Sequence, residues 1–532
     1  MTLLAHLALL ATILAPLALL ATAVTERGRA RLPGLLAFAP LPGLAAALLA
    51  ADAPPLIFYA DWLRLSLGLD APGALLLGVA ALLWSAAGAY AGAYLPGATR
   101  FAGWWLVTLA GSLGVFIAGD LVTCYFSFAL VSLAAYGLVV HDATPQARRA
   151  GAIYLALAVL GEVFLLFAFA LLAVNIPGQS LAISDAVAAL PGSPMRDVTI
   201  LLLLLGFGLK AGLVPLHVWL PLAHPAAPMP ASAVLSGAII KAGIIGLIRF
   251  LPMEGGIPAW GEALGPLGFA TAFYGVALGI TQRNPKTILA YSSVSQMGVV
   301  MAALGFGLAA GDAGTPLAAA QYASHHVLAK GALFLGVGVA LATGARRWPW
   351  VLAPVLLLVL SFGGLPFTGG ALAKEATKAQ LGTGLLGWLS ALSAAGTTML
   401  MLHFAARLRG GSAPAPEARA PLGLVLPFAG MTAAALLLPW WLYPAPVKFW
   451  PALWPVLLGV LGFLALRAMD ARLPRPPEGD VLVFAERAAM RLAPPLAARA
   501  ARIETALRAW PSAGLALLGL AILLGLAMVL GA

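Results

Sequence analysis

The sequence predicts an all-α polytopic membrane protein with about 14–16 transmembrane helices. Of its 532 residues, 62% are hydrophobic and only 9% are charged, which is far from the balance of a soluble domain. Apolar runs of roughly 20 residues, each able to cross a hydrocarbon core of about 30 Å as a helix, follow one another with short polar breaks. The run over 3–24 lacks a basic start and precedes further spans, so we expect a retained first helix rather than a signal peptide.

Two of the expected helices contain residues that interrupt helical hydrogen bonding. Pro215 removes a backbone donor from the seventh helix, and Pro366 and Gly370 interrupt the twelfth. Because the breaks lie five helices apart and an odd-numbered repeat reverses its direction through the membrane, the spacing predicts two inverted five-helix repeats. The expected order is helices 1–3 in 1–100, helices 4–8 in 101–252, helices 9–13 in 258–408, helices 14–15 in 420–468, an amphipathic segment over 474–510 and a last helix in 511–532.

The basic residues lie almost entirely in alternate loops. By the positive-inside rule these loops are cytoplasmic, so we expect a plasma (inner) membrane protein with its N-terminus outside and 474–510 on the cytoplasmic face. This topology accounts for the net charge of +11. We therefore expect the chain to contact the lipid bilayer and to bind no nucleic acid. The alternate basic loops carry Arg27, Arg29, Arg31, Arg100, Arg148, Arg149, Arg346, Arg347, Arg407, Arg409 and the arginines between 467 and 508.

The sequence contains no motif for covalent or redox chemistry. Cys124 is its single cysteine, which excludes an internal disulfide and any cysteine-based metal or iron–sulfur site. Nucleophile motifs, phosphate loops and dinucleotide fingerprints are also absent from it. We therefore expect no metal, no cofactor and no substrate chemistry in this chain itself.

Ionisable side chains inside the expected spans are the candidate functional residues. A charged group at bilayer depth costs roughly 2.5–3.5 kcal/mol on insertion scales, so such a residue normally faces a partner or a wet cavity. Burial favours a neutral lysine and a nearby carboxylate favours a charged one, so together they can take up and release a proton. The alternative is that each lysine merely snorkels or caps a helix. The candidate proton pathway consists of Glu162, Lys210, His217, Lys241, His326, Lys330 and Lys374.

A resemblance to a known family is carried by residues 206–243, which read GFGLKAGLVPLHVWLPLAHPAAPMPASAVLSGAIIKAG. This stretch resembles the central signature of the proton-translocating antiporter-like subunits shared by respiratory complex I, membrane-bound hydrogenases of the hydrogenase-4 type and Mrp cation/proton antiporters. Three further segments follow in the family's order, namely NPKTILAYSSVSQMGVV, HVLAKGALFLGVG and GGLPFTGGALAKE. The resemblance covers roughly residues 65–410.

The resemblance implies roles for individual residues. Lys210 would serve the first half-channel, Lys241 would link it to the centre, His326 and Lys330 would connect the halves, and Lys374 would be the lysine of the broken twelfth helix. Protons would move along a hydrated central axis, and no electrons would pass through this chain. The implied partners are other membrane subunits of the same complex, including other antiporter-like subunits, and redox cofactors would lie on those partners.

Three functions remain open on the sequence. The first is a proton-translocating subunit of a redox-driven oxidoreductase related to complex I or membrane-bound hydrogenase. Within this class the resemblance leans toward hydrogenase-like complexes, because Leu222 stands where many complex I members carry an acid. The second is an Mrp-type monovalent cation/proton antiporter subunit. The third is a structural subunit that has lost transport.

One position departs from the family pattern. The family usually carries a glutamate in its fifth span that pairs with the seventh-span lysine, and Ala129 stands at that place here. Glu162 lies at a similar depth in the next span, so we expect it to replace the missing partner of Lys210. The alternative is that Glu162 is a protonated structural acid, since a neutral carboxyl is cheaper to bury than a charged one.

Overall fold

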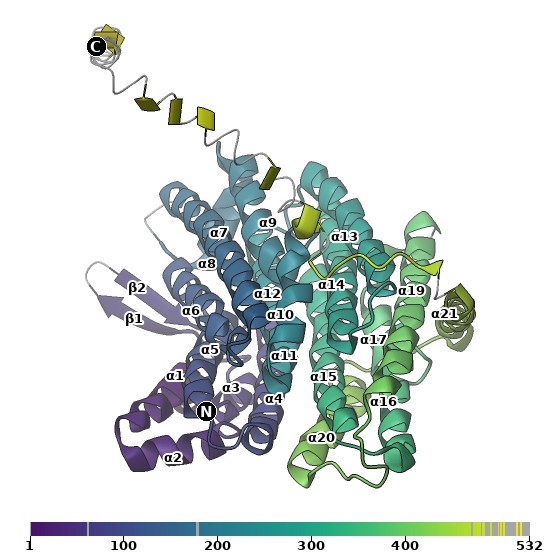
Figure 1. Ribbon diagram of the computed structural model, residues 1–532. Helices are drawn as coiled ribbons and strands as arrows, with labels where there is room; N and C mark the ends of the chain where they lie inside the picture. Colours follow the sequence, from purple (N-terminus) through teal and green to yellow (C-terminus); the bar gives the residue numbers. More distant parts are fainter. Residues whose placement is uncertain are drawn as a thin grey trace. The chain divides into compact units, whose positions relative to one another are not determined.

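The computed structural model describes residues 2–60, 63–176, 180–382, 384–469 and 472–479, with short stretches between 481 and 523. It is almost entirely helical (Figure 1). The chain up to residue 250 forms α1 (Thr2–Ala21), α2 (Glu26–Leu35), α3 (Leu41–Leu49), β1 (Leu56–Ala60), β2 (Leu63–Leu67), α4 (Ala71–Tyr94), α5 (Thr99–Ile117), α6 (Leu121–Val139), α7 (Pro145–Asn175), α8 (Ile183–Ala189), α9 (Arg196–Ala211), α10 (Trp219–Ala226), α11 (Met229–Val234) and α12 (Lys241–Phe250). The chain from residue 258 onward forms α13 (Pro258–Gly279), α14 (Pro285–Ala310), α15 (Thr315–Leu341), α16 (Trp348–Gly363), α17 (Gly369–Ala376), α18 (Lys378–Leu381), α19 (Gly384–Leu408), α20 (Leu422–Leu442) and α21 (Phe449–Met469).

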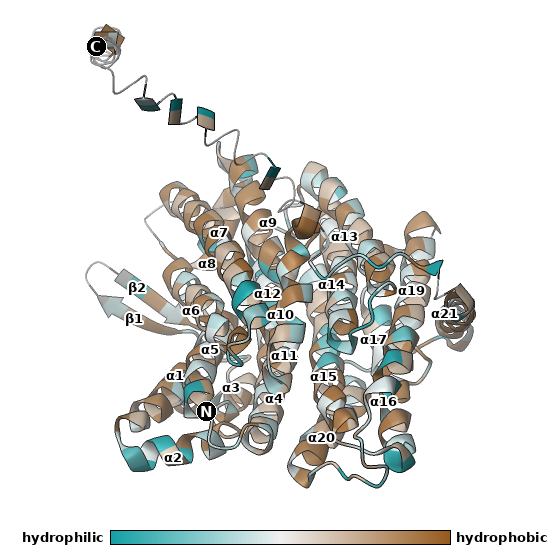
Figure 2. Cartoon of the chain, viewed as in Figure 1, coloured by the Kyte–Doolittle hydropathy of each residue, from teal (hydrophilic) through white to brown (hydrophobic). Residues whose placement is uncertain are grey.

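Thirteen helical spans of the described chain are long and apolar enough to cross a membrane, which confirms the predicted all-α polytopic class. Helices satisfy every backbone group internally, as lipid requires, and Figure 2 shows hydrophobic residues along most of them. Two further predicted spans correspond to α13, which packs on α14, and to the short α3, which packs on α1 and α4. The predicted last helix at 511–532 and most of the amphipathic segment at 474–510 lie outside the described residues.

Both predicted helix breaks are present, and each begins at a glycine, three residues before Pro215 in the first and two residues before Pro366 in the second. The seventh span stops after α9 at Gly212, whose φ of 90° is left-handed, and resumes through the 3₁₀ turn η4 (Leu216–Val218) into α10. The twelfth stops after α16 at Gly364, with φ 93°, and resumes at α17. A glycine ends a helix in this conformation without a Cβ penalty, and the prolines that follow prevent its continuation. The repeat boundaries drawn from these breaks stay a prediction.

A third irregularity was not expected from the sequence. The eighth span contains a π-helical segment, η5 (Leu235–Ile239), between α11 and α12. There the Ile240 amide donates to the Leu235 carbonyl, five residues back instead of four. Such π segments are rare and recur at functional sites. This one ends immediately before Lys241.

The described chain also contains one antiparallel hairpin, formed by β1 and β2, which the sequence analysis did not predict. Its second strand continues along the end of α5 through a bridge between Leu67 and Ala118. Asp120 caps α6 by accepting from Thr123 N at 2.8 Å, and its other oxygen accepts from Ser66 N at 2.7 Å. The hairpin was missed because its apolar strands of five residues each cannot be separated from helix ends by periodicity alone.

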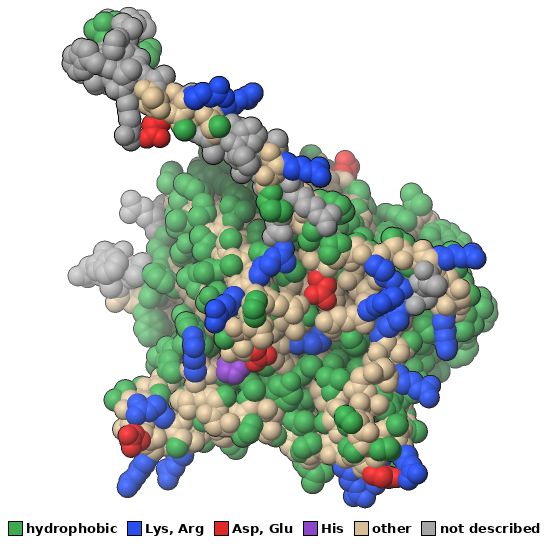
Figure 3. Space-filling model, viewed as in Figure 1, with side chains coloured by type: hydrophobic (Ala, Val, Ile, Leu, Met, Phe, Trp, Pro, Cys, Tyr) green, Lys and Arg blue, Asp and Glu red, His purple; other side chains and the backbone are tan. Residues whose placement is uncertain are grey.

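The central helices of the bundle are the ones that carry the candidate lysines and histidines. The spans Met229–Phe250 and Thr315–Leu341 are 100% and 94% buried, whereas the first and the last described spans are only 22% buried. The outer spans present apolar side chains outward, and Figure 3 shows hydrophobic side chains over most of one face with Lys and Arg scattered over it in small groups. Lys241, His326 and Lys330, which these two spans carry, therefore lie in the core of the protein rather than on its outer surface.

An ion pair and several hydrogen bonds connect the start of α4 with the ends of α5 and α12. Asp70 caps α4 by accepting from Gly73 N at 2.9 Å and pairs with Arg249 of α12 at 2.8 Å. Arg249 also donates to the carbonyls of Val115, Phe116 and Ala118 at the end of α5. Burial alone raises the pKa of Asp70, but the charge of Arg249 and its hydrogen bonds outweigh burial and hold that pKa below the usual value.

We expect Asp70→Asn to lower the thermal unfolding midpoint of the detergent-solubilised protein at pH 7. Because the folded-state pKa of Asp70 is depressed, its stabilisation is present at neutral pH and is lost as the pH falls below the ordinary value of 3.8. Melting curves between pH 3 and pH 7 should therefore converge for the wild type and Asp70→Asn at the acid end. Asp52→Asn, at an exposed aspartate, is the control and should follow the wild type. Parallel curves for Asp70→Asn and the wild type would contradict the assignment.

Candidate functional site

Lys210 lies at the end of α9, directly before the first break, and is 3% exposed. Its Nζ donates to the Ser132 hydroxyl at 2.9 Å and approaches the Tyr154 hydroxyl at 3.4 Å. The rings of Phe128 and Tyr154 lie 5.6 and 5.7 Å from Nζ, within the range of cation–π attraction. The ammonium of Lys210 is thus met by hydroxyl groups and aromatic faces.

Glu162 of α7 lies near Lys210 without contacting it directly. It is 6% exposed, and neither carboxyl oxygen has a hydrogen bond in the described structure. It interacts electrostatically with Lys210, and Ser132, which accepts from Lys210, is also its neighbour. The described ion pairs do not include Glu162 with Lys210. The structure therefore brings the two residues together across Ser132, and the predicted pairing stays a prediction.

His217 stands within the first break, on the turn η4, and is fully buried. Its ring packs edge-on against Tyr274 at 5.0 Å and lies 6.3 Å from the ring of Tyr291. Beside it, the Val214 amide donates to the Thr271 hydroxyl at 3.3 Å. The interrupted backbone thus gains a side-chain partner from α13, as expected for non-helical chain at membrane depth.

The centre of the bundle brings Lys241 and His326 into direct contact. Lys241 Nζ lies 2.5 Å from His326 Nδ1 and donates to the Ser236 carbonyl of the π segment at 3.2 Å. One turn along α15, Lys330 donates to the Leu289 carbonyl of α14 at 2.8 Å, with its Nζ 5.2 Å from the Phe362 ring. The three predicted central residues therefore form one buried cluster, and His326 Nε2 is left without a hydrogen bond there.

His224 is a buried residue that the sequence analysis did not select. Both of its ring nitrogens lack hydrogen bonds in the described structure, and its ring stacks on Phe334 at 4.9 Å. It interacts electrostatically with both Lys330 and Lys286. Lys286, at the start of α14, is 7% exposed and donates to the Ala227 carbonyl. The signal in the sequence was the spacing of seven residues from His217, which places both histidines on one helical face.

Polar side chains continue from the centre toward Lys374 along α15. His325 Nε2 lies 3.1 Å from the Ser361 hydroxyl, at the end of α16. Tyr322, one turn earlier, donates to Gln296 at 2.9 Å, and the Nζ of Lys374 lies 5.9 Å from the Tyr322 ring. The contacts of His325 with Ser361 and of Tyr322 with Lys374 join α15 to α16 and α17, the helices that flank the second break, and the Tyr322 hydrogen bond to Gln296 joins it to α14.

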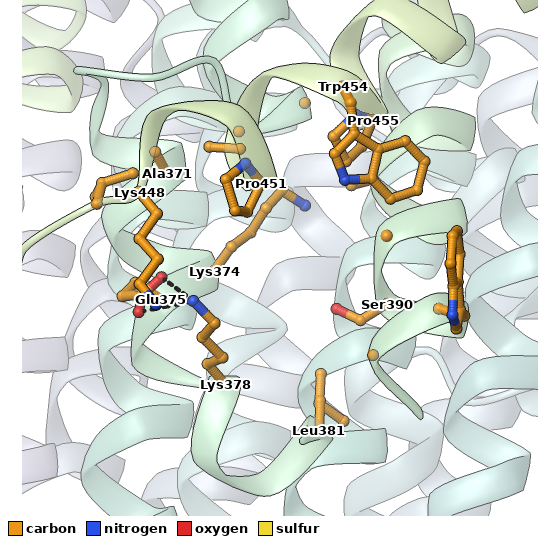
Figure 4. A pocket seen from close by; sticks show the side chains of 18 of the residues that line it. Ala371, Lys374, Glu375, Lys378, Leu381, Ser390, Lys448, Pro451, Trp454 and Pro455 are labelled. Carbon is orange, nitrogen blue, oxygen red and sulfur yellow. Dashed lines mark hydrogen bonds and ion pairs between the residues drawn. The ribbon is translucent and has the colours of Figure 1, made fainter. Parts of the chain in front are cut away.

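Lys374 stands on α17, just after that break, and lines a cavity of about 360 Å³ between α17, α19 and α21. Figure 4 shows Lys378 and Lys448 beside Glu375, which pairs with Lys378 at 3.0 Å, while the side chain of Lys374 extends away from that carboxylate. The φ of 93° at Gly364 brings the backbone close to the lysine stem, where an added Cβ would lie 2.7 Å from Lys374 Cδ. The break thus makes room for this lysine at the edge of the buried row, beside a cavity that opens outward.

The remaining predicted site residues define the breaks. Pro215, Pro366 and Gly370 all lie in or beside the interrupted segments, and the Gly370 amide donates to the Ser361 hydroxyl at 3.2 Å. Among the residues that the structure describes, no three His, Cys, Asp or Glu side chains are grouped to hold a metal ion. The site is a row of ionisable groups, from Glu162 to Lys374, separated by hydroxyls, carbonyls and aromatic rings.

Comparison with known proteins supplies three findings. Residues 118–400 match the family model described as NADH:quinone oxidoreductase/Mrp antiporter, transmembrane. Hydrogenase-4 component B of Escherichia coli strain K12 is 29% identical over an alignment of 354 positions, which covers 62% of this chain and 52% of that protein. The chain therefore spans about half the length of this curated relative.

Two solved structures share the fold. A chain of the Mrp complex from Dietzia sp. DQ12-45-1b matches with a TM-score of 0.75 and 23% identity, over 99% of this chain and 63% of that chain. A chain of the membrane-bound sulfane sulfur reductase, an archaeal respiratory membrane complex, matches with a TM-score of 0.68 and 23% identity, over 92% and 84%. Both matching chains are subunits of multi-subunit membrane complexes.

We expect Ser132→Ala to lower the free energy of unfolding by about 1–3 kcal/mol, because it removes a hydrogen-bond acceptor from a buried charged donor. The effect should appear as a lower thermal midpoint in detergent. Ser295→Ala is the matched control, since the buried Ser295 hydroxyl has no hydrogen bond in the described structure. Equal thermal midpoints for the two variants would contradict a stabilising hydrogen bond from Lys210 to Ser132.

Proposed function

The chain belongs to the NADH:quinone oxidoreductase/Mrp antiporter transmembrane family, and on this basis we propose that it translocates protons as an antiporter-like subunit of a multi-subunit membrane complex. The observation that carries the proposal is the row of lysines Lys210, Lys241, Lys330 and Lys374. The first three are buried, Lys241 contacts His326 at the core of the bundle, and Lys374 is half-buried beside a cavity. Titratable groups at bilayer depth are rare outside proton and ion pathways. Carboxylate-rich sites, which a metal cation would favour, do not occur along the described row.

The geometry suggests how a proton would move along this row. Lys210 would accept a proton at the first break, with Glu162 favouring its charged form and Ser132 holding its Nζ in place. The contact between Lys241 and His326 would pass the proton inward, because an imidazole can accept at one nitrogen and donate from the other. Lys330 would then carry it toward Lys374, whose cavity offers the exit.

Water would enter this row through the irregular backbone. The breaks after Gly212 and Gly364 expose backbone groups beside Lys210 and Lys374, and such chain survives at membrane depth where protein or water satisfies it. His224 and Lys286 would form a second input, since His224 interacts with both Lys286 and the central Lys330. A proton on one lysine repels a proton on the next, so the occupied positions would alternate along the row.

The setting of the subunit follows from charge and family. With the arginine-rich loops on the cytoplasmic side of the plasma (inner) membrane, the N-terminus would lie outside. The complex would be related to complex I or membrane-bound hydrogenase, with electron transfer and redox cofactors on partner subunits and no chemistry in this chain. An Mrp-type cation/proton antiporter is the second candidate, favoured by the fold shared with the Dietzia Mrp complex. A structural subunit without transport is the third.

Proton flux in vesicles containing the reconstituted complex tests this proposal. We expect Lys210→Ala and Lys374→Ala each to reduce flux at least about tenfold, because each removes a carrier that no neighbouring side chain replaces. Arg31→Ala, which removes an exposed cation outside the row, is the control. Unchanged proton flux in both lysine variants would contradict proton translocation by this chain and would support the structural subunit without transport. Flux that requires external sodium or potassium at fixed pH would favour the antiporter.

The role of Glu162 has its own test in the same assay. We expect Glu162→Gln to reduce flux about as strongly as Lys210→Ala, because the amide keeps the shape of the side chain but removes the charge that favours protonated Lys210. Glu254→Gln, at an exposed acid between α12 and α13, is the matched control. Normal flux in Glu162→Gln together with loss in Lys210→Ala would show that Glu162 is a structural acid.

A further inference from the structure

A groove with arginines at one end lies between α16, α19 and α21, away from the lysine row. Arg407 and Arg409 come from the end of α19 and the turn after it, and Arg467 comes from the last turn of α21. Leu352 and Leu356 of α16 and Phe463 of α21 form apolar walls. The hollow measures about 530 Å³. From this combination of cations and apolar walls we propose that the groove binds an anionic phospholipid, a function independent of proton transfer.

The charge of the groove calls for an anion. Among the described residues that line it and the hollow beside it there is no aspartate or glutamate. Within the described part of the chain the ion pairs do not include Arg409 or Arg467, and nearby Glu417 is already paired with Arg346. Guanidinium groups bind phosphate oxygens through two parallel hydrogen bonds, so a phosphate would offset their mutual repulsion.

The walls select a lipid over a soluble anion. Leu352, Leu356 and Phe463 are half-buried, and the helices that carry them belong to spans able to cross a membrane. The arginines stand at the ends of these apolar helices, at the depth where phospholipid headgroups lie. A phosphate held there would leave its acyl chains to run along the leucines, where they would replace lipid contacts of the free bilayer.

The groove continues into a second hollow that lengthens it. This hollow, about 410 Å³, shares Leu352, Leu356 and Arg409 with the first. Trp348 lines it, is only 6% exposed, and its indole nitrogen has no hydrogen-bond partner in the described structure. A buried indole donor is normally satisfied, and a headgroup or glycerol oxygen would satisfy this one.

The full-length protein in detergent tests the proposal by native mass spectrometry and thermal melting. Cardiolipin and phosphatidylglycerol should bind and raise the melting midpoint, whereas phosphatidylcholine and inorganic phosphate should not. The triple variant Arg407→Gln, Arg409→Gln, Arg467→Gln should bind at least about tenfold more weakly, since each cation near a membrane surface contributes about 1 kcal/mol to anionic-lipid binding. The triple variant Arg27→Gln, Arg31→Gln, Arg419→Gln, at exposed arginines, is the charge-matched control and should bind as the wild type does.

A second pair of variants separates the groove from general surface charge and from misfolding. Leu356→Trp keeps every arginine but fills the apolar wall, and it should also lose the lipid. Arg409→Gln alone changes one groove cation and should weaken binding several-fold in a protein that melts cooperatively. Equal binding by the two triple variants, or unchanged binding by Leu356→Trp, would overturn the proposal. Stabilisation by inorganic phosphate equal to that by phosphatidylglycerol would assign the arginines to a soluble anion.

Discussion

The burial of lysine ammonium groups at the centre of an apolar helical bundle is the constraint on which the rest of this structure depends. Each such group costs roughly 2.5–3.5 kcal/mol at bilayer depth and must be met by polar atoms. The partners observed are largely uncharged: Lys210 donates to a hydroxyl, Lys330 to a main-chain carbonyl, and Lys241 to a carbonyl and an imidazole. A neutral oxygen holds a lysine without fixing its charge, whereas a carboxylate favours the protonated form. Neutral partners therefore suit groups that are to gain and lose protons.

The three interrupted spans have irregular backbone close to the lysines that need polar partners. A regular helix uses nearly all of its carbonyls internally, so it offers a buried cation little besides its termini. Here α9 ends directly after Lys210, the π segment ends directly before Lys241, and α17 begins shortly before Lys374. In the π segment Ile240 bonds to Leu235, and the neighbouring Ser236 carbonyl accepts from Lys241. The departure from helical geometry in the π segment thus supplies an oxygen for Lys241, whereas Lys210 and Lys330 use a hydroxyl and a carbonyl of regular helices.

The first half of the row differs from the second in how its charge is balanced. Ala129 leaves α6 without an acid, and Glu162 approaches from α7 across the hydroxyl of Ser132 instead of through a direct ion pair. An interaction across an intervening hydroxyl is weaker than a contact pair, so Lys210 is held less firmly in its charged form. Around Lys374, by contrast, the acid Glu375 is paired with Lys378. The contact of Lys241 with His326 lies between these two differently balanced ends of the row.

The sequence by itself determined the membrane class, most of the spans, both glycine- and proline-containing breaks and the burial of Lys210, Lys241 and Lys330, but not that of Lys286. These features depend on the composition of consecutive residues and on the cost of placing a charge in lipid, so they can be predicted from local sequence. It missed the hairpin, the π segment, the role of Ser132 and the buried His224. Ser132 lies 78 positions from Lys210, and Lys241 lies 85 positions from His326. Only the packing of distant helices brings these atoms within hydrogen-bond distance, because side-chain contacts between spans follow from helix rotation and depth, which no local pattern specifies.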